Sequence, residues 1–194
     1  QLIITATDTE VEVNTVMPLG TQEQVKVAIP ARKLFDICKE LPESSDIKIE
    51  LSSKQAKIKS GRSRFTLALS SGQEFPKIGD FNNLCEFEIE IGLLKNLIDK
   101  TEFAMALQDV RHYLNGLLLE VQDDLIRAVA TDGHRLAMAE ENVKAESGEL
   151  IQSIIPRKGV IEINRLLSGF DKATKAELRL GTNHLKIMIS DEVS

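Results

Sequence analysis

The chain has 194 residues, of which 42% are hydrophobic and 28% are charged, so fibrous, low-complexity and disordered classes are excluded. Its formal net charge of −6 argues against a nucleic-acid-binding protein that is basic throughout. Cys38 and Cys85 lack CxxC spacing, which predicts reduced thiols in the core and neither a disulfide framework nor a zinc site. No apolar run is long enough to span a membrane, and no signal peptide is evident, so we expect a cytoplasmic protein without a membrane partner.

In chain order, the first half predicts two strands, a helix and a further group of strands. Apolar patterning favours strands at Leu2–Thr7 and Val11–Val16 and a helix over Ala31–Leu41. The segment 57–64 alternates basic residues and predicts two strands joined by a turn. It lacks the GxxxxGK[ST] spacing of a phosphate-binding loop. A strand at Phe65–Leu69 is expected to follow.

The second half predicts the order strand, helix, strands twice in succession. A strand at Glu86–Ile91 precedes a helix over Gly92–Lys100, and a strand near Leu150–Ile155 precedes a helix over Arg157–Leu167. Pro156 stands where a proline is tolerated at a helix start. The remaining strands are expected at residues 116–121, 125–131, 136–140, 176–180 and 185–189.

Three blocks of the first half recur in order in the second half. Leu2–Glu10 resembles Ile126–His134, with Ala-Thr-Asp in common, and two later blocks match at similar offsets. The repeat predicts a duplicated βαβββ unit in an α+β fold. We expect a first domain at residues 1–73, a linker at 74–85 and a second domain at 86–194. The offsets further predict that the first domain lacks its N-terminal part and the second its last strand.

Basic residues are concentrated in the three predicted helices. These helices carry a net charge of +4 within a chain whose net charge is −6, so the rest of the chain is acidic. Two interpretations follow: these are ordinary solvated helix faces, or together they form one positive surface that contacts phosphates weakly and independently of base sequence. The basic residues are Arg32, Lys33, Lys39, Lys95, Lys100, Arg157, Lys158 and Arg165.

The densest polar cluster is Thr131-Asp-Gly-His-Arg135. Asp132 and His134 could form a metal pair or an acid–base couple, which would indicate a metal-dependent nucleic-acid hydrolase. However, the matching segment 7–10 keeps the Asp and lacks the His, and no further metal-ligand pattern occurs in the sequence. We therefore favour a turn between strands in which the Asp side chain caps the backbone, and we expect neither catalysis nor a cofactor.

Six motifs together resemble the beta sliding clamp family of bacterial DNA polymerase III. They are IPARK at 29–33, SGRSRF at 60–65, EFP at 74–76, YLNG at 113–116, ATDGHRL at 130–136 and IPRKGV at 155–160. The resemblance implies the DNA-clamp fold, with antiparallel sheets outside and helices lining one face. It implies a non-catalytic processivity factor that encircles duplex DNA as a homodimer of three-domain subunits. Its partners would be DNA polymerase, the clamp loader and other proteins, which would dock through short linear motifs of the Gln-Leu-x-Leu-Phe kind. The third domain would be absent from this chain, which could then not close a ring.

The resemblance also assigns two sets of site residues. The DNA-binding set is Arg32, Gln108, Arg111, His112, Tyr113, Arg157 and Lys158. The partner-peptide pocket is Leu114, Thr131, Gly133, His134, Arg135 and Leu136. Plain core packing is the alternative role for Leu114 and Leu136. A peptide-binding adaptor without DNA function is the remaining alternative for the whole chain.

Overall fold

The computed structural model describes residues 1–20, 25–72, 75–76, 79, 81–145, 147–182 and 184–189. The chain divides into two compact units, one of Gln1 and residues 18–78 and one of residues 2–17 and 79–194. The hairpin at residues 2–17 is thus grouped with the second unit, whereas the sequence repeat assigns it to the first domain. The expected linker at 74–85 includes residues 74, 77, 78 and 80, which lie outside the described residues, and the predicted domain limits stay predictions.

The first unit contains one helix and two small sheets. Its elements are β3 (Val27–Ala28), α1 (Ala31–Glu40), β4 (Lys48–Leu51), β5 (Gln55–Ser60), β6 (Ser63–Ala68) and β7 (Ser70–Ser71). The order β4-β5-β6 is antiparallel, and β3 pairs with β7. Ala56, Ile58 and Leu67 are its buried apolar side chains among the described residues, whereas none of the ten residues of α1 is buried. Cys38 of α1 is therefore exposed, so the prediction of a core thiol is wrong for Cys38 and confirmed for Cys85. The predicted helix and the predicted strand pair with its turn are confirmed.

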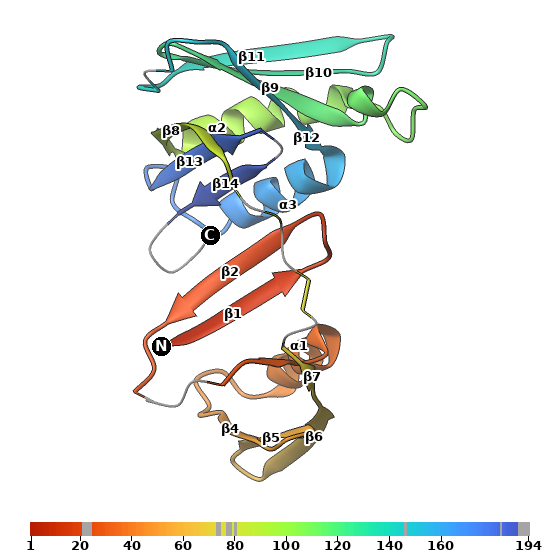
Figure 1. Cartoon of the computed structure of the whole chain (residues 1–194), viewed down its shortest axis with the longest axis vertical. Helices are drawn as coiled ribbons and strands as arrows, with labels where there is room; N and C mark the ends of the chain where they lie inside the picture. The colour runs from red at the N-terminus through yellow and green to blue at the C-terminus, as the bar shows by residue number, and fades with distance from the viewer. Residues whose placement is uncertain are drawn as a thin grey trace. The chain divides into compact units, whose positions relative to one another are not determined.

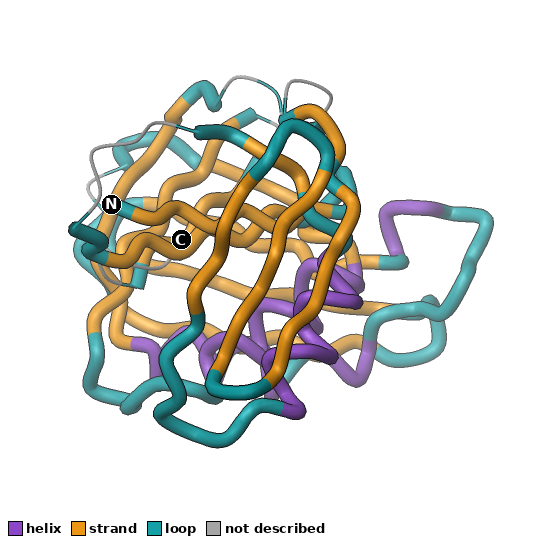
Figure 2. Tube along the Cα trace, turned by 90° about the horizontal axis from the view of Figure 1, so that it is seen from below, coloured by secondary structure: helices purple, strands orange, loops and turns teal. Residues whose placement is uncertain are grey.

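The second unit contains two complete sheet–helix combinations (Figure 1). Its elements are β1 (Leu2–Thr7), β2 (Glu12–Met17), β8 (Asn83–Glu90), α2 (Ile91–Asp99), η1 (Glu102–Ala104), η2 (His112–Leu114), β9 (Gly116–Gln122), β10 (Leu125–Thr131), β11 (Leu136–Asn142), β12 (Ile151–Pro156), α3 (Arg157–Leu167), β13 (Lys175–Gly181) and β14 (Leu185–Met188). The sheet orders are β11-β10-β9-β12 and β14-β13-β8, and each of these pairings is antiparallel. Strands predominate in the described chain (Figure 2). The predicted βαβββ repeat is confirmed.

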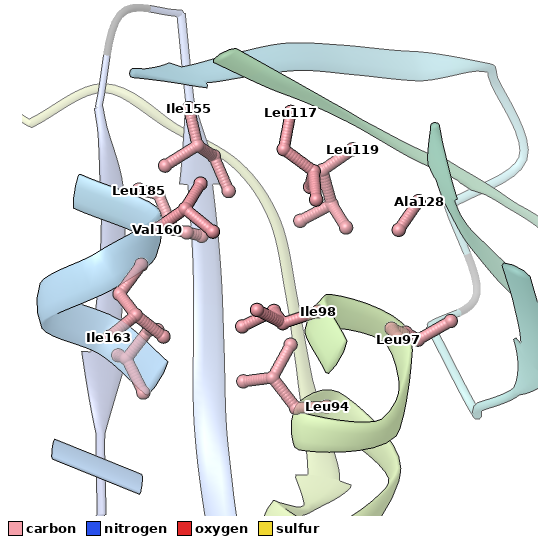
Figure 3. A pocket seen from close by; sticks show the side chains of 11 residues that line it. Leu94, Leu97, Ile98, Leu117, Leu119, Ala128, Ile155, Val160, Ile163 and Leu185 are labelled. Carbon is pink, nitrogen blue, oxygen red and sulfur yellow. The ribbon is translucent and has the colours of Figure 1, made fainter. Parts of the chain in front are cut away.

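The core of the second unit lies between both helices and both sheets (Figure 3). Alternation along β9 and β10 turns Leu119 and Ala128 inward, where they line one space with Leu97 of α2 and Val160 of α3. The packing leaves a void of about 10 Å³ whose lining is entirely apolar. A void of that size holds at most one water molecule, and an apolar lining gives a water no partners. This internal space is therefore a packing defect and not a ligand site.

The duplicated Thr-Asp turns have the same hydrogen bonds in both copies. Asp132 Oδ1 accepts from the backbone N–H of residues 134 and 135, and Asp8 Oδ1 accepts from those of residues 10 and 11. The hydroxyls of Thr131 and Thr7 each donate to the carbonyl four residues later. The third turn residue has positive φ in both, +88° at Gly133 and +79° at Thr9. The predicted turn with a capping Asp is confirmed.

Candidate nucleic-acid and partner sites

An open groove of about 540 Å³ lies between the loop after η1 and the start of α3. Its lining brings together three residues of the predicted DNA-binding set, Gln108, Arg157 and Lys158. Sequence reasoning missed Ile161 and Glu162, which lie four residues after Arg157 and Lys158 and so share their helix face. Helical spacing was the signal that could have found them. The remaining lining residues are Ala106, Leu107 and Asn115.

Asn115 joins this loop to helix α3. Its amide Nδ2 donates to the carbonyl of Asp109 and its Oδ1 accepts from the Asp109 N–H, both at 2.8 Å. Its backbone carbonyl accepts from the N–H of Arg157 at 2.9 Å, which satisfies one of the free donors at the helix start. The loop that carries Gln108, itself at φ +56°, is therefore held against the first turn of α3. The sequence analysis assigned no role to Asn115.

The cations on the helices differ in whether a nearby carboxylate neutralises them. Lys158 Nζ lies 2.6 Å from Asp8 Oδ2 and 3.3 Å from Glu10 Oε2. The hydrogen bond to Asp8 raises the pKa of Lys158, and the same contact lowers the pKa of Asp8 to about 2. Lys95 of α2 is likewise engaged, by Asp99 and an α3 side chain. Arg157 makes no ion pair within the described residues and is the cation that this groove presents to a ligand.

Arg111 lies apart from the groove lining and beside the predicted partner pocket. Its Nη2 is 2.9 Å from Asp109 Oδ2 and its Nε donates to Asp109 Oδ1 at 3.0 Å. A Cβ added to Gly133 would lie 3.1 Å from the same Nη2, so the guanidinium touches the β10–β11 turn. His112 and Tyr113 lie on η2 with exposed side chains. On the other unit, Arg32 of α1 is exposed and 3.4 Å from Asp36.

Asp109 is expected to titrate far below the ordinary range for a carboxyl group. The hydrogen bonds from the Arg111 side chain and backbone lower its pKa to about 2. Because the folded-state pKa is depressed, the contact stabilises the loop fully above the unfolded value of about 3.9. That stabilisation is lost as the pH falls through 2. Carbon-detected NMR titration should give a midpoint near 2 for Asp109 and a higher one in Arg111→Gln. An unchanged midpoint in that variant would contradict the assigned cause.

The predicted partner-pocket residues separate into one buried and several exposed members. Leu114 is only 7% exposed, so core packing describes its surroundings, whereas Leu136 is 65% exposed at the start of β11. Gly133, His134 and Arg135 are exposed on the turn between them and Thr131 is partly exposed. The turn and the Leu114 loop meet through Arg111. This arrangement forms one wall that carries an exposed leucine beside exposed turn backbone.

Asp132 and His134 are not arranged as a catalytic pair. Both carboxylate oxygens of Asp132 accept hydrogen bonds, Oδ1 from backbone N–H groups and Oδ2 from Arg135 Nε at 2.9 Å. These hydrogen bonds lower the pKa of Asp132. Within the described residues, no group of three or more His, Cys, Asp or Glu side chains could hold a metal ion. The Asp side chain therefore builds the turn and holds Arg135.

Phe103 is a further exposed residue of this wall that the sequence analysis missed. The guanidinium carbon of Arg135 lies 5.6 Å from the centre of its ring, within cation–π range. Its side chain is 56% exposed although it is apolar. In the sequence, Phe103 stands out only because aromatic residues are few. That observation does not show whether the side chain lies on the surface or in the core. The contact orients Arg135 next to the turn.

Gly133→Ala is expected to destabilise the second unit by about 1–2 kcal/mol, because an L residue at φ +88° is strained. The added Cβ would also push Arg111 off the turn, since their separation would be 3.1 Å. Gly148→Ala is the matched control, because Gly148 also has positive φ but has no atom within 4 Å of the added Cβ. Urea unfolding measures the stability of both variants. The titration midpoint of Asp109 should change only in Gly133→Ala. Equal behaviour of the two variants would contradict the Arg111 contact.

The fold and these surfaces define the DNA-clamp class, in which βαβββ units place antiparallel sheets on one side and paired helices on the other. The sequence profile of the DNA polymerase III beta subunit N-terminal domain matches residues 1–79, and that of its central domain matches residues 88–194. The chain belongs to the DNA polymerase III beta subunit family. None of the helices in the described part of the chain has the length and apolarity needed to cross a membrane.

Named relatives and solved structures agree with this family. The beta sliding clamp of Pseudomonas aeruginosa is 44% identical over 187 residues, which are 96% of this chain and 50% of that protein. The beta sliding clamp of Haemophilus influenzae is 41% identical over 194 residues, 100% of this chain and 52% of that protein. A crystal structure of the P. aeruginosa DNA polymerase sliding clamp with ligand superposes with a TM-score of 0.93 at 41% identity, over 98% of this chain and 52% of that one. A sliding clamp of the same species bound to griselimycin gives 0.90 at 41% identity, again over 98% of this chain and 52% of that one. The chain thus spans about half the length of the relatives it matches.

Proposed function

We propose that this chain is part of a DNA sliding clamp, a processivity factor that tethers the replicative DNA polymerase to duplex DNA by encircling it. The observation that carries the proposal is the open groove with Arg157 at the start of α3, in a chain of this family. Arg157, which makes no ion pair within the described residues, lies beside the neutral Gln108. A single cation of this kind attracts a phosphate weakly and does not distinguish one base from another. Weak, sequence-blind contacts of this kind suit a protein that slides.

We further propose that the protein catalyses nothing itself and acts by topology in the bacterial cytoplasm. The engaged carboxylate of Asp132 supports this over the hydrolase alternative. The full-length protein would be a homodimeric ring with DNA polymerase and the clamp loader as partners. We do not expect this chain by itself to close a two-subunit ring, and sedimentation equilibrium tests that expectation. A closed dimer of the 194-residue chain would contradict it.

Charge reversal of Arg157 tests the DNA proposal. The double variant Arg32→Glu/Arg157→Glu is expected to weaken binding of a fluorescent duplex at least tenfold, uniformly across sequences. It should also reduce the slope of log affinity against log salt by about one for each lost phosphate contact. Lys144→Glu reverses one charge on an exposed residue outside the groove lining and is the control for each single reversal. Equal losses in Lys144→Glu, or sequence-selective binding by the parent chain, would contradict the proposal.

We propose that partner proteins dock a short segment at the turn 131–136. Leu136 offers exposed apolar surface, and the turn beside it exposes its backbone at Gly133. Burial of one apolar anchor is worth about 1.5–3 kcal/mol, or about tenfold to a hundredfold in affinity. Leu136→Asp should therefore reduce binding of a Gln-Leu-Ser-Leu-Phe peptide by about that factor in a fluorescence titration. Leu136 is exposed, so the variant should unfold like the parent, and unchanged peptide binding would contradict this location.

A further inference from the structure

The outer face of the four-stranded sheet, opposite its helix-covered side, is organised into rows. Outward residues of neighbouring strands face each other in register across β12, β9, β10 and β11. One row is polar and consists of Gln152, Glu120, Arg127 and Glu140. The next row, here called the apolar row, consists of Ile154, Leu118, Val129 and Met138. Met138 is 56% exposed and Ile154 48%, so the apolar row is not covered by the described chain.

The polar row is closed by its own contacts. Arg127 bonds to both Glu140 and Glu120, and Gln152 donates to Glu120 at 2.6 Å. These hydrogen bonds hold the side chains of the polar row in place, so the polar row forms an ordered border along the apolar row. The border holds two carboxylates for one guanidinium, and the β9–β10 turn beyond it adds Asp123 and Asp124. The polar row itself therefore carries a net negative charge.

Among the described residues, the sheet β14-β13-β8 of the same unit has no such row on its outer face. Its outward residues pair as charges, with Lys175 bonded to Glu88 and Arg179 close to Glu86. Each sheet combines strands of both halves of the repeat in an equivalent arrangement, so the repeat itself does not require an apolar outer face. The apolar row is thus a particular feature of the β11-β10-β9-β12 sheet. It also continues the wall described above, because Leu136 precedes Met138 by two residues on the same face of β11.

We propose that the apolar row is a docking surface for the continuation of the partner segment that binds at Leu136. This inference rests on the proposed docking function. It specifies the side chains that the partner segment carries next to the five-residue motif. The continuing segment is extended, places an aliphatic side chain over Met138 and Val129, and places a Lys or Arg near Glu120 and Glu140. Successive outward residues on a strand are about 7 Å apart, a distance that an extended peptide spans with two residues.

A second copy of this chain is a poorer occupant. Stable protein interfaces bury about 800 Å² per partner. The apolar row offers four side chains, two of them only partly exposed, so its area suits a short segment better than a whole folded surface. Its negative border would also face an identical negative border in a symmetric pair, which is unfavourable. The charge of the border instead favours a basic segment.

The test compares three synthetic peptides on the same chain by fluorescence titration. The first is Gln-Leu-Ser-Leu-Phe, and the other two extend it by Gly-Leu-Gly-Lys at the C-terminus or by Lys-Gly-Leu-Gly at the N-terminus. One extended peptide is expected to bind about tenfold tighter than the short one, since a further aliphatic side chain is buried. Met138→Ser should abolish that gain and leave the short peptide's affinity unchanged. Met188→Ser, on the charged sheet, is the matched control and should keep the gain.

The outcomes separate this inference from the docking proposal beneath it. If the short peptide binds but neither extended peptide binds more tightly, the apolar row is not a docking surface. The same conclusion follows if an extended peptide keeps its higher affinity in Met138→Ser. In both cases the proposed docking site at Leu136 is retained. If the short peptide does not bind at all, the docking function fails and this inference fails with it. A loss of self-association in Met138→Ser, seen by sedimentation, would assign the row to a second copy and overturn the proposal.

Discussion

Leu97→Ala is expected to lower the free energy of unfolding of the second unit by about 3–5 kcal/mol. Leu97 is fully buried on α2 and lines the apolar void together with residues of α3, β9 and β10 (Figure 3). The substitution removes the transfer free energy of the lost carbons and also leaves a cavity. The cavity would be added to the void of about 10 Å³ that Leu97 already lines, so its neighbours have little means of closing it.

Urea unfolding followed by circular dichroism measures this loss. Leu136→Ala is the matched control, because it deletes the same atoms from a side chain that is 65% exposed, and its effect should stay within about 0.5 kcal/mol. Xenon binding should appear in Leu97→Ala and not in the parent, since an enlarged apolar cavity stays dry. A loss below about 1 kcal/mol would show that the site collapses and that the core is less tightly packed than described.

Gly116→Ala is expected to cost more than 3 kcal/mol or to prevent folding of the second unit. Gly116 begins β9 and pairs with Pro156. A Cβ there would lie 2.5 Å from the carbonyl oxygen of Ile155 and 3.0 Å from the Cγ2 of Ile154. The first contact is with backbone, so β12 would have to move away from β9. Asn115, whose carbonyl accepts from Arg157, would move with it and the groove would open.

Gly169→Ala is the control for Gly116→Ala in the same unit. Its added Cβ would lie 3.4 Å from the nearest atom, the carbonyl oxygen of Leu166, which is ordinary contact. It should change the unfolding free energy by no more than about 0.5 kcal/mol. If Gly116→Ala unfolds like the parent but binds duplex DNA more weakly, the close approach matters for the groove alone. If both properties stay unchanged, the strand approach drawn here is wrong.

Hydrophobic periodicity alone determined most of the fold. The helix predicted over 92–100 is observed as Ile91–Asp99, and the one predicted over 157–167 is observed with those bounds. Internal repetition predicted the duplicated βαβββ halves, and the matching Thr-Asp turns repeat hydrogen bond for hydrogen bond. These features are local, because the face that a residue occupies depends on spacing along its own strand or helix.

Only the tertiary structure decided which charges and apolar faces are available to a ligand. The sequence placed Arg157 and Lys158 together as basic residues, yet Lys158 is neutralised by a turn some 150 positions earlier in the chain, and Arg157 is not. Arg111 turned out to face Gly133, and Leu114 to be buried where Leu136 is exposed. The register that aligns Met138 with Val129 and Leu118 could not be read from any single strand. Pairing and burial depend on neighbours that arrive from distant positions, and periodicity specifies a residue's face without specifying what that face meets.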